Sequence, residues 1–162
     1  MGCGKSSTGR ELAGILGAGF VDLDELVVRR EGRSIPDIFL DGEAAFRRAE
    51  ASALASLLES CGTSPLVIAL GGGTLTFPPA RDLVLERTTC VWLRTRLGTI
   101  RDRLGGSDSS RPLFKDADHL FAERESIYSA AAFAVDTDGL TPREVAFRIA
   151  GFFADGGKRP LF

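Results

Sequence analysis

Short apolar runs of the kind that form buried strands alternate with amphipathic helical patterns along the whole chain. The runs are "GFVDLD", "PLVIAL", "TTCVWLR" and "FAVDT", and helical patterns stand between them. This alternation is typical of a parallel sheet with helices on both of its faces. The sequence therefore predicts an α/β fold, and a chain of 162 residues suits a single domain over residues 1–162.

Charge and cysteine content exclude several classes of protein. The net charge is −2 and the pI about 5.5, whereas a general nucleic-acid binder carries a basic surface. No apolar run reaches the roughly 18 residues of a membrane span, and the first residues lack the apolar stretch of a signal peptide. Cys3, Cys61 and Cys90 have no C-x-x-C spacing, which argues against a zinc site or a disulfide framework. We expect a cytoplasmic monomer that binds neither nucleic acid nor a membrane.

The first ten residues, "MGCGKSSTGR", contain the end of a phosphate-binding pattern. The Walker A pattern is G-x-x-x-x-G-K-[ST] between a strand and a helix, and Gly4, Lys5 and Ser6 supply its last three positions. In such a loop the lysine reaches the β- and γ-phosphates and the hydroxyl binds Mg²⁺. The first glycine of the pattern and the preceding strand would both fall before Met1. From the residues alone, the run is either an accidental glycine-rich start before a helix or part of a chain that lacks its beginning.

Two carboxylates end the expected strand "GFVDLD". Asp22 and Asp24 are two residues apart, so on a strand their side chains point to the same face at its carboxyl end. Ligands of α/β sheets bind at this end. One carboxylate could support Mg²⁺, and the other could orient or deprotonate an attacking hydroxyl. The alternative is that one of them caps the helix beginning "DELVV", a role that suits Asp24.

Three glycines and three arginines complete the candidate site. Residues 71–73 are consecutive glycines after a buried strand, which allows a ligand to approach the backbone; a tight turn without a ligand needs fewer glycines. Arg47 and Arg124 lie on expected helices, and Arg111 lies in a polar segment between them. Each arginine alone suits a solvated surface. Together with a phosphate loop they suit clamps for carboxylates and phosphates.

The polar segment "GGSDSSRPLFKD" separates two helical patterns. It is rich in glycine and serine and is broken by proline, which is typical of a long functional loop. We expect a mobile lid at about residues 105–118 and a frayed tail over residues 155–162.

Six stretches in order along the chain resemble the signatures of the shikimate kinase family. They are "GCGKSSTGRELAGILGAGFVDLDE", "GRSIPDIF", "GEAAFRRAE", "LGGGTLT", "RPLF" and "AERESIY". The resemblance covers nearly the whole chain and implies a P-loop protein of the nucleoside-monophosphate-kinase-like group. It implies transfer of the γ-phosphoryl group of ATP to the 3-hydroxyl of shikimate, on the route to chorismate and the aromatic amino acids. The cofactors it implies are ATP and Mg²⁺.

The resemblance also implies roles for residues around ATP. Ser6 and Asp22 would hold Mg²⁺. Lys5 would contact the phosphates, and Arg111 would move from the lid onto the phosphates during transfer. Arg103 would stack on the adenine. The phosphate loop would consist of Gly2, Cys3, Gly4, Lys5, Ser6 and Ser7.

A second set of residues would hold shikimate. Asp24 would contact its hydroxyl groups and is the candidate base. Arg47 and Arg124 would bind its carboxylate. The amides that would contact the ring belong to Gly71, Gly72 and Gly73.

The implied fold is a five-stranded parallel sheet in the order 2-3-1-4-5, flanked by helices. The strand before the phosphate loop is the central one in this order, and here it is missing or truncated. A strand and half a loop amount to about ten residues. We therefore expect the natural polypeptide to begin about that far upstream of Met1.

Two other functions stay open at this point. The chain could be a non-catalytic relative whose incomplete phosphate loop binds a nucleotide or a partner, or another small-molecule kinase such as a gluconate kinase. An enzyme is favoured, because a module that only binds has no need of both substrate and lid arginines, and the chain has Asp24, Arg47, Arg111 and Arg124 together. The pair of Arg47 and Arg124, with the "LGGG" run, favours shikimate as the acceptor.

Overall fold

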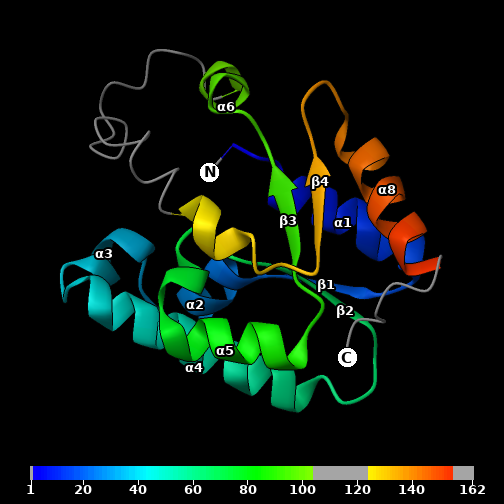
Figure 1. Ribbon diagram of the computed structural model, residues 1–162. Coiled ribbons are helices and arrows are strands. Elements are labelled where there is room, and N and C mark those ends of the chain that lie inside the picture. Colours follow the sequence, from blue (N-terminus) through cyan, green and yellow to red (C-terminus); the bar gives the residue numbers. More distant parts are fainter. Residues whose placement is uncertain (1, 104–123, 155–162) are drawn as a thin grey trace.

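The computed structural model describes residues 2–103 and 124–154 (Figure 1). Among these residues, no helix is both long and apolar enough to cross a membrane. The expected lid with Arg111 and the expected tail lie outside the described residues. The elements are α1 (Lys5–Leu16), β1 (Gly19–Asp22), α2 (Leu23–Glu31), α3 (Ile35–Phe39), α4 (Glu43–Ser60), β2 (Leu66–Ala69), the 3-10 turn η1 (Thr74–Thr76), α5 (Pro78–Arg87), β3 (Val91–Arg94), α6 (Leu97–Arg103), β4 (Phe133–Asp136) and α8 (Pro142–Ala154).

The four strands form two parallel pairs. β1 pairs with β2 so that Asp22 lies opposite Ala69, and β3 pairs with β4 so that Arg94 lies opposite Asp136. Within the described residues, β2 and β3 are each paired on one side only. In the expected order 2-3-1-4-5, the pair of β1 and β2 corresponds to strands 2 and 3, and the pair of β3 and β4 corresponds to strands 4 and 5. The predicted parallel arrangement is confirmed.

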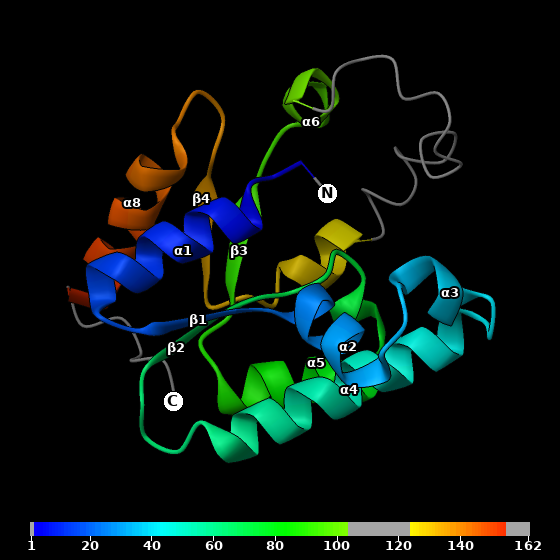
Figure 2. The ribbon, with the colours of Figure 1, turned by 180° about the vertical axis from the view of Figure 1, so that it is seen from behind.

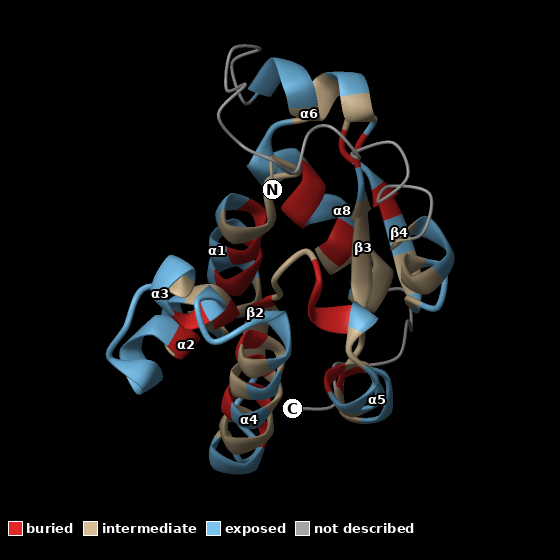
Figure 3. Ribbon diagram, turned by 90° about the vertical axis from the view of Figure 1, so that its left-hand side faces the viewer, coloured by how far each residue is buried: buried red, intermediate tan, exposed pale blue. Residues whose placement is uncertain are grey.

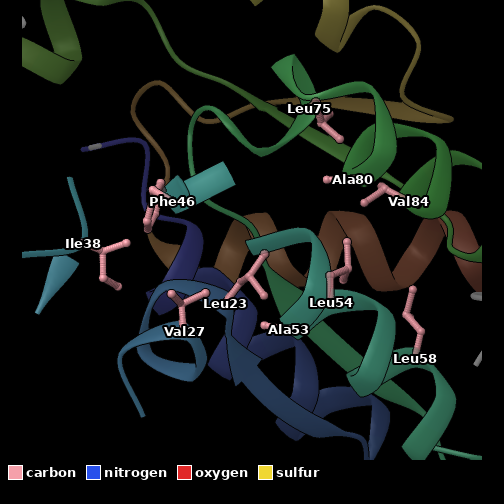
Figure 4. Packing of buried hydrophobic residues seen from close by; sticks show 10 residues of the cluster. All are labelled: Leu23, Val27, Ile38, Phe46, Ala53, Leu54, Leu58, Leu75, Ala80 and Val84. Atoms are coloured by element: carbon pink, nitrogen blue, oxygen red, sulfur yellow. The ribbon is translucent and has the colours of Figure 1, made fainter. Parts of the chain in front are cut away.

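Helices cover both faces of the strands, as expected (Figures 1 and 2). α1 and α8 pack against each other on one side, and α2, α3, α4 and α5 pack together on the other. Buried residues face inward on both sides (Figure 3). The smaller core consists of Leu12, Val135, Val145, Ala146 and Ile149. The larger core (Figure 4) consists of Leu23, Val27, Ile38, Phe46, Ala53, Leu54, Leu58, Leu75, Ala80 and Val84.

A cavity of about 540 Å³ extends between β2 and β3, where its walls are apolar, and it is also lined by polar residues that include Lys5, Asp24 and Arg47. β2 contributes Val67 and Ile68 to its wall, β3 contributes Val91 and Leu93, and α1 contributes Leu12. Side chains around a void lose dispersion contacts that a filled core would make. The middle of the sheet is therefore the part of this fold in which added apolar atoms would stabilise most.

Candidate active site

The chain turns sharply as it enters α1. Gly2 and Gly4 have φ of 78° and 87°, in the left-handed region that glycine adopts without strain. α1 has no side-chain cap, so the N–H groups of its first turn are available to an anion at the positive end of the helix dipole. Lys5 lies beside this turn, with Nζ 3.6 Å from Sγ of Cys3. This local geometry suits a phosphate-binding site.

Ser6 and Asp22 meet where α1 begins and β1 ends. The Ser6 hydroxyl donates to Oδ2 of Asp22 at 2.5 Å. Oδ1 of Asp22 accepts hydrogen bonds from the backbone N–H groups of Asp24 at 3.1 Å and Glu25 at 3.5 Å. Hydroxyl and carboxylate oxygens are ligands that Mg²⁺ prefers. The structure thus brings together the two residues that the resemblance assigns to the metal.

The position of Asp24 differs from the sequence prediction. The strand was expected to run through Asp24, and this expectation is wrong. The alternative that one of the two carboxylates caps the next helix is confirmed, but the cap is Asp22 and not Asp24. β1 ends at Asp22, α2 begins at Leu23, and Asp22 is the capping residue. The physical reason is that the Asp22 carboxylate satisfies free N–H groups of the first turn, which favours starting the helix over extending the strand.

Asp24 faces the site from the first turn of α2. Burial, and secondly the Asp22 carboxylate, raise the pKa of Asp24 above its ordinary value of 3.8, while the charges of Lys5 and Arg47 oppose the rise. A Cβ atom on Gly71 would lie 3.0 Å from Oδ1 of Asp24, so this carboxylate reaches the glycine loop of residues 71–73. A partly buried carboxylate with a raised pKa suits a general base.

Arg47 of α4 is held by two carboxylates of different exposure. Its Nη1 lies 2.5 Å from Oε2 of Glu50, which is fully buried, and its Nη2 lies 3.0 Å from Oε1 of Glu43, which is exposed. Oε1 of Glu50 accepts from the Thr74 hydroxyl at 2.8 Å, and a Cβ atom on Gly71 would lie 2.7 Å from it. Burial raises the pKa of Glu50 against the opposing effects of Arg47 and Thr74. Glu50 therefore joins Arg47 to the glycine loop.

Both candidate carboxylate-binding arginines reach the glycine loop. A Cβ atom on Gly73 would overlap the guanidinium group of Arg47, so only glycine fits there beside Arg47 in its present position. A Cβ atom on Gly72 would lie 3.5 Å from Nη1 of Arg124. Arg47, Arg124 and Asp24 thus converge on one short stretch of backbone. This close approach explains the glycines better than a plain turn does.

Arg103, at the end of α6, links the phosphate loop to the loop after β4. Its Nη1 donates to the carbonyl oxygen of Gly2 and its Nη2 to that of Thr137, both at 3.3 Å. This position beside the phosphate loop is compatible with the adenine contact implied by the resemblance. Arg111 lies outside the described residues, and its role stays a prediction.

Two residues of this site are absent from the sequence predictions. Glu50 lies four residues after Phe46 on the buried face of α4, so a charged residue within an apolar stripe was the available signal. Tyr128 lies four residues after Arg124 in the helical segment 124–128. Its hydroxyl donates to the carbonyl oxygen of Gly72 at 2.5 Å. The sequence places Tyr128 on the helical face of Arg124 but contains no sign of its partner.

The site has two chemically distinct halves, and Lys5 of one half lines the same cavity as Asp24, Arg47 and Arg124 of the other. One half combines the phosphate loop with the pair of Ser6 and Asp22, and it suits a metal-bound polyphosphate. The other half combines arginines, a carboxylate and backbone N–H groups, and it suits a small carboxylated molecule with hydroxyl groups. Such a site can place a hydroxyl next to a terminal phosphate.

Comparison with known families agrees with this arrangement. The sequence model of the family described as shikimate kinase matches residues 1–153. The chain belongs to the shikimate kinase family. A shikimate kinase of Halorhodospira halophila is 41% identical over 157 residues, which cover 92% of this chain and 86% of that protein. One of Thermus thermophilus is 41% identical over 156 residues, which cover 92% of this chain and 83% of that protein.

Solved structures of the shikimate kinase family share the fold. The enzyme from Acinetobacter baumannii in complex with shikimate has a TM-score of 0.87 at 31% identity, over 98% of this chain and 91% of that one. The enzyme from Aquifex aeolicus has a TM-score of 0.80 at 35% identity, over 97% and 95%. The predicted fold and family are confirmed. As a member of this family, the protein is an ATP-dependent kinase that uses Mg²⁺.

Proposed function

We propose that this chain transfers the γ-phosphoryl group of ATP to the 3-hydroxyl of shikimate, giving 3-phosphoshikimate and ADP for chorismate and aromatic amino acid synthesis. The observation that carries the proposal is the convergence of Arg47, Arg124 and Asp24 on the glycine loop. Arginine matches a carboxylate bidentately, and shikimate is a small carboxylate with several hydroxyl groups. The Acinetobacter baumannii relative was solved with shikimate bound, which supports the same acceptor here.

In the ATP half, the chain acts by binding and charge neutralisation. Lys5 would pair with the β- and γ-phosphates, and Ser6 and Asp22 would hold Mg²⁺, which would supply positive charge to neutralise the phosphate oxygens. Arg103 would contact the adenine, and Arg111 would act on the transferring phosphate. The phosphates accept hydrogen bonds from the backbone of Gly2, Cys3, Gly4 and Ser7.

In the acceptor half, the chain orients the attacking hydroxyl. Arg47 and Arg124 bind the carboxylate, and the amides of residues 71–73 fix the ring. Asp24 then accepts the proton of the attacking hydroxyl at a carboxylate oxygen. Because phosphoryl transfer proceeds through a loose transition state, positioning and electrostatic stabilisation supply most of the rate enhancement.

Replacing Asp24 by Asn is expected to lower kcat about 100-fold, because an amide cannot take the proton. In the unmodified enzyme, only the ionised carboxylate is active, so kcat/KM should fall as the pH drops through the pKa of Asp24. Since that pKa is raised above 3.8, the acidic limb should lie above pH 3.8 as well. Initial rates of ADP release across a pH series measure both effects, and an unchanged kcat in D24N would contradict the role of Asp24.

Replacing Ser6 by Ala is expected to raise the Mg²⁺ concentration for half-maximal rate by about tenfold. The variant removes the hydroxyl that lies 2.5 Å from Asp22 and leaves the acceptor half intact. The KM for shikimate should therefore stay the same. A Mg²⁺ titration of the rate at saturating ATP measures the change. An unaltered Mg²⁺ requirement would show that Ser6 does not bind the metal.

Shikimate-dependent ADP release from Mg-ATP tests the proposal against its alternatives. Release with gluconate but not with shikimate would identify another small-molecule kinase of the same fold. Binding of a non-hydrolysable ATP analogue without any turnover would identify a non-catalytic relative. We further propose a cytoplasmic monomer that binds no nucleic acid, which sedimentation and fractionation can check.

A further inference from the structure

Tyr128 makes a contact with the glycine loop that the mechanism above does not use. It is the only tyrosine of the chain. Its hydroxyl donates to the carbonyl oxygen of Gly72 at 2.5 Å, and its ring lies 5.9 Å from that of Trp92, centroid to centroid. Figure 2 shows the segment that carries Tyr128, in yellow, beside the green loop that follows β2. The side chain also packs against the larger core.

This hydrogen bond fixes the direction of one peptide group. In a trans peptide the carbonyl oxygen and the following N–H point to opposite sides, so holding the Gly72 oxygen also sets where the Gly73 N–H points. A run of glycines has more conformational freedom than any other sequence and loses it all on ordering. The Arg47 guanidinium lies close to the α-carbon of Gly73. Tyr128 and Arg47 therefore both contact the two residues that this peptide joins.

The same residue ties the segment that carries Arg124 to the loop. Arg124 and Tyr128 are four residues apart in one helical segment, so their side chains share a face. Nη1 of Arg124 would lie 3.5 Å from a Cβ atom on Gly72, the residue whose carbonyl Tyr128 binds. The positive charges of Arg124 and Arg47 both act on the phenol, although burial dominates and raises its pKa above the ordinary value of 10.0. The hydroxyl thus keeps its proton and stays a donor at neutral pH.

We propose that Tyr128 is a positioning residue for the acceptor: it orients the Gly72–Gly73 peptide and fixes Arg124 relative to it, so that amide and guanidinium meet one carboxylated, hydroxyl-bearing molecule. This inference rests on the proposed function, because it needs the glycine loop to be the acceptor site. Tyr128 itself touches no reacting atom. Its removal should therefore weaken acceptor binding and leave the ATP half unaffected.

Replacing Tyr128 by Phe tests this role, since it removes the hydroxyl and keeps the ring. The KM and the Kd for shikimate should rise about 5- to 15-fold, as loss of one well-placed hydrogen bond predicts. The change in kcat should be smaller, and the Kd for ADP should not change. Trp92 is the only tryptophan and contacts the Tyr128 ring, so an unchanged emission spectrum in Y128F will show that the ring has kept its place.

Thr88→Val is the matched control, because it also removes one hydroxyl that donates to a backbone carbonyl, that of Val84 at 2.7 Å. This contact lies at the end of α5, away from the glycine loop, so T88V should leave both affinities unchanged. The inference is overturned if Y128F loses shikimate and ADP affinity to the same degree, or loses neither. Arg47→Lys separates this result from failure of the site itself. If R47K binds shikimate normally, the acceptor lies elsewhere, whatever Y128F does.

Discussion

Replacing Glu50 by Ala should destabilise the protein by about 3 to 5 kcal/mol and raise the Kd for shikimate about 10- to 100-fold. Glu50 is fully buried, with Nη1 of Arg47 at 2.5 Å from one oxygen and the Thr74 hydroxyl at 2.8 Å from the other. The Arg47 side chain is only 12% exposed, so it would keep its desolvation cost and lose its buried partner. At roughly 2 to 4 °C per kcal/mol for a chain of this size, the Tm should fall by about 10 °C.

Glu43→Ala is the control for this prediction. Glu43 binds the same guanidinium at 3.0 Å, but its side chain is 66% exposed, and exposed pairs contribute only about 0 to 1 kcal/mol. Thermal unfolding and calorimetric titration with shikimate should therefore separate the two variants clearly. Glu50→Gln keeps the volume of the side chain while removing its charge, and it should also weaken shikimate binding. Equal losses in E43A and E50A would show that the buried carboxylate does not determine the position of Arg47.

The fold is predictable wherever the signal lies within one segment. Apolar runs and helical patterns are local, and they predict the strands and their parallel arrangement; the order of the strands was implied only by the resemblance to the family. The phosphate loop is equally local. The boundary between β1 and α2 was missed because two local signals compete there: the strand pattern continues through Asp24, but the cap at Asp22 starts the helix earlier.

The candidate site is predictable only in part, because its contacts join distant segments. Resemblance to a family indicates the arginines and glycines, and the structure places Arg47 and Arg124 at the same loop. Glu50 reaches a partner 24 residues away, and Tyr128 one that is 56 residues away. The hydrophobic periodicity of a segment does not predict contacts with residues so far away in the sequence. A buried charge and a lone tyrosine are visible in the sequence, but their partners are set by tertiary packing alone.

Adding a strand that fills the cavity between β2 and β3 should raise the Tm by about 10 °C. Both strands expose one unpaired edge within the described residues, and apolar side chains of both strands line part of the cavity of about 540 Å³. α1 begins at the carboxyl edge of the strands, where Ser6 meets Asp22, so a strand leading into it would run parallel to both neighbours. Each buried apolar side chain contributes about 1.5 to 3 kcal/mol, and ordering costs about 1 to 2 kcal/mol per residue. About five such residues should therefore give a net gain of a few kcal/mol.

The designed extension joins Met1 and carries about five β-branched residues, followed by a glycine five positions before Gly4. That glycine completes the pattern G-x-x-x-x-G-K-S, so the affinity for Mg-ATP should rise about tenfold in the same variant. An extension of equal length with Ser and Asp at the apolar positions is the control, because unpaired polar groups are too costly to bury. Scanning calorimetry of the three chains measures the effect. If the apolar extension stabilises no more than the polar one, the space between β2 and β3 does not accept a strand.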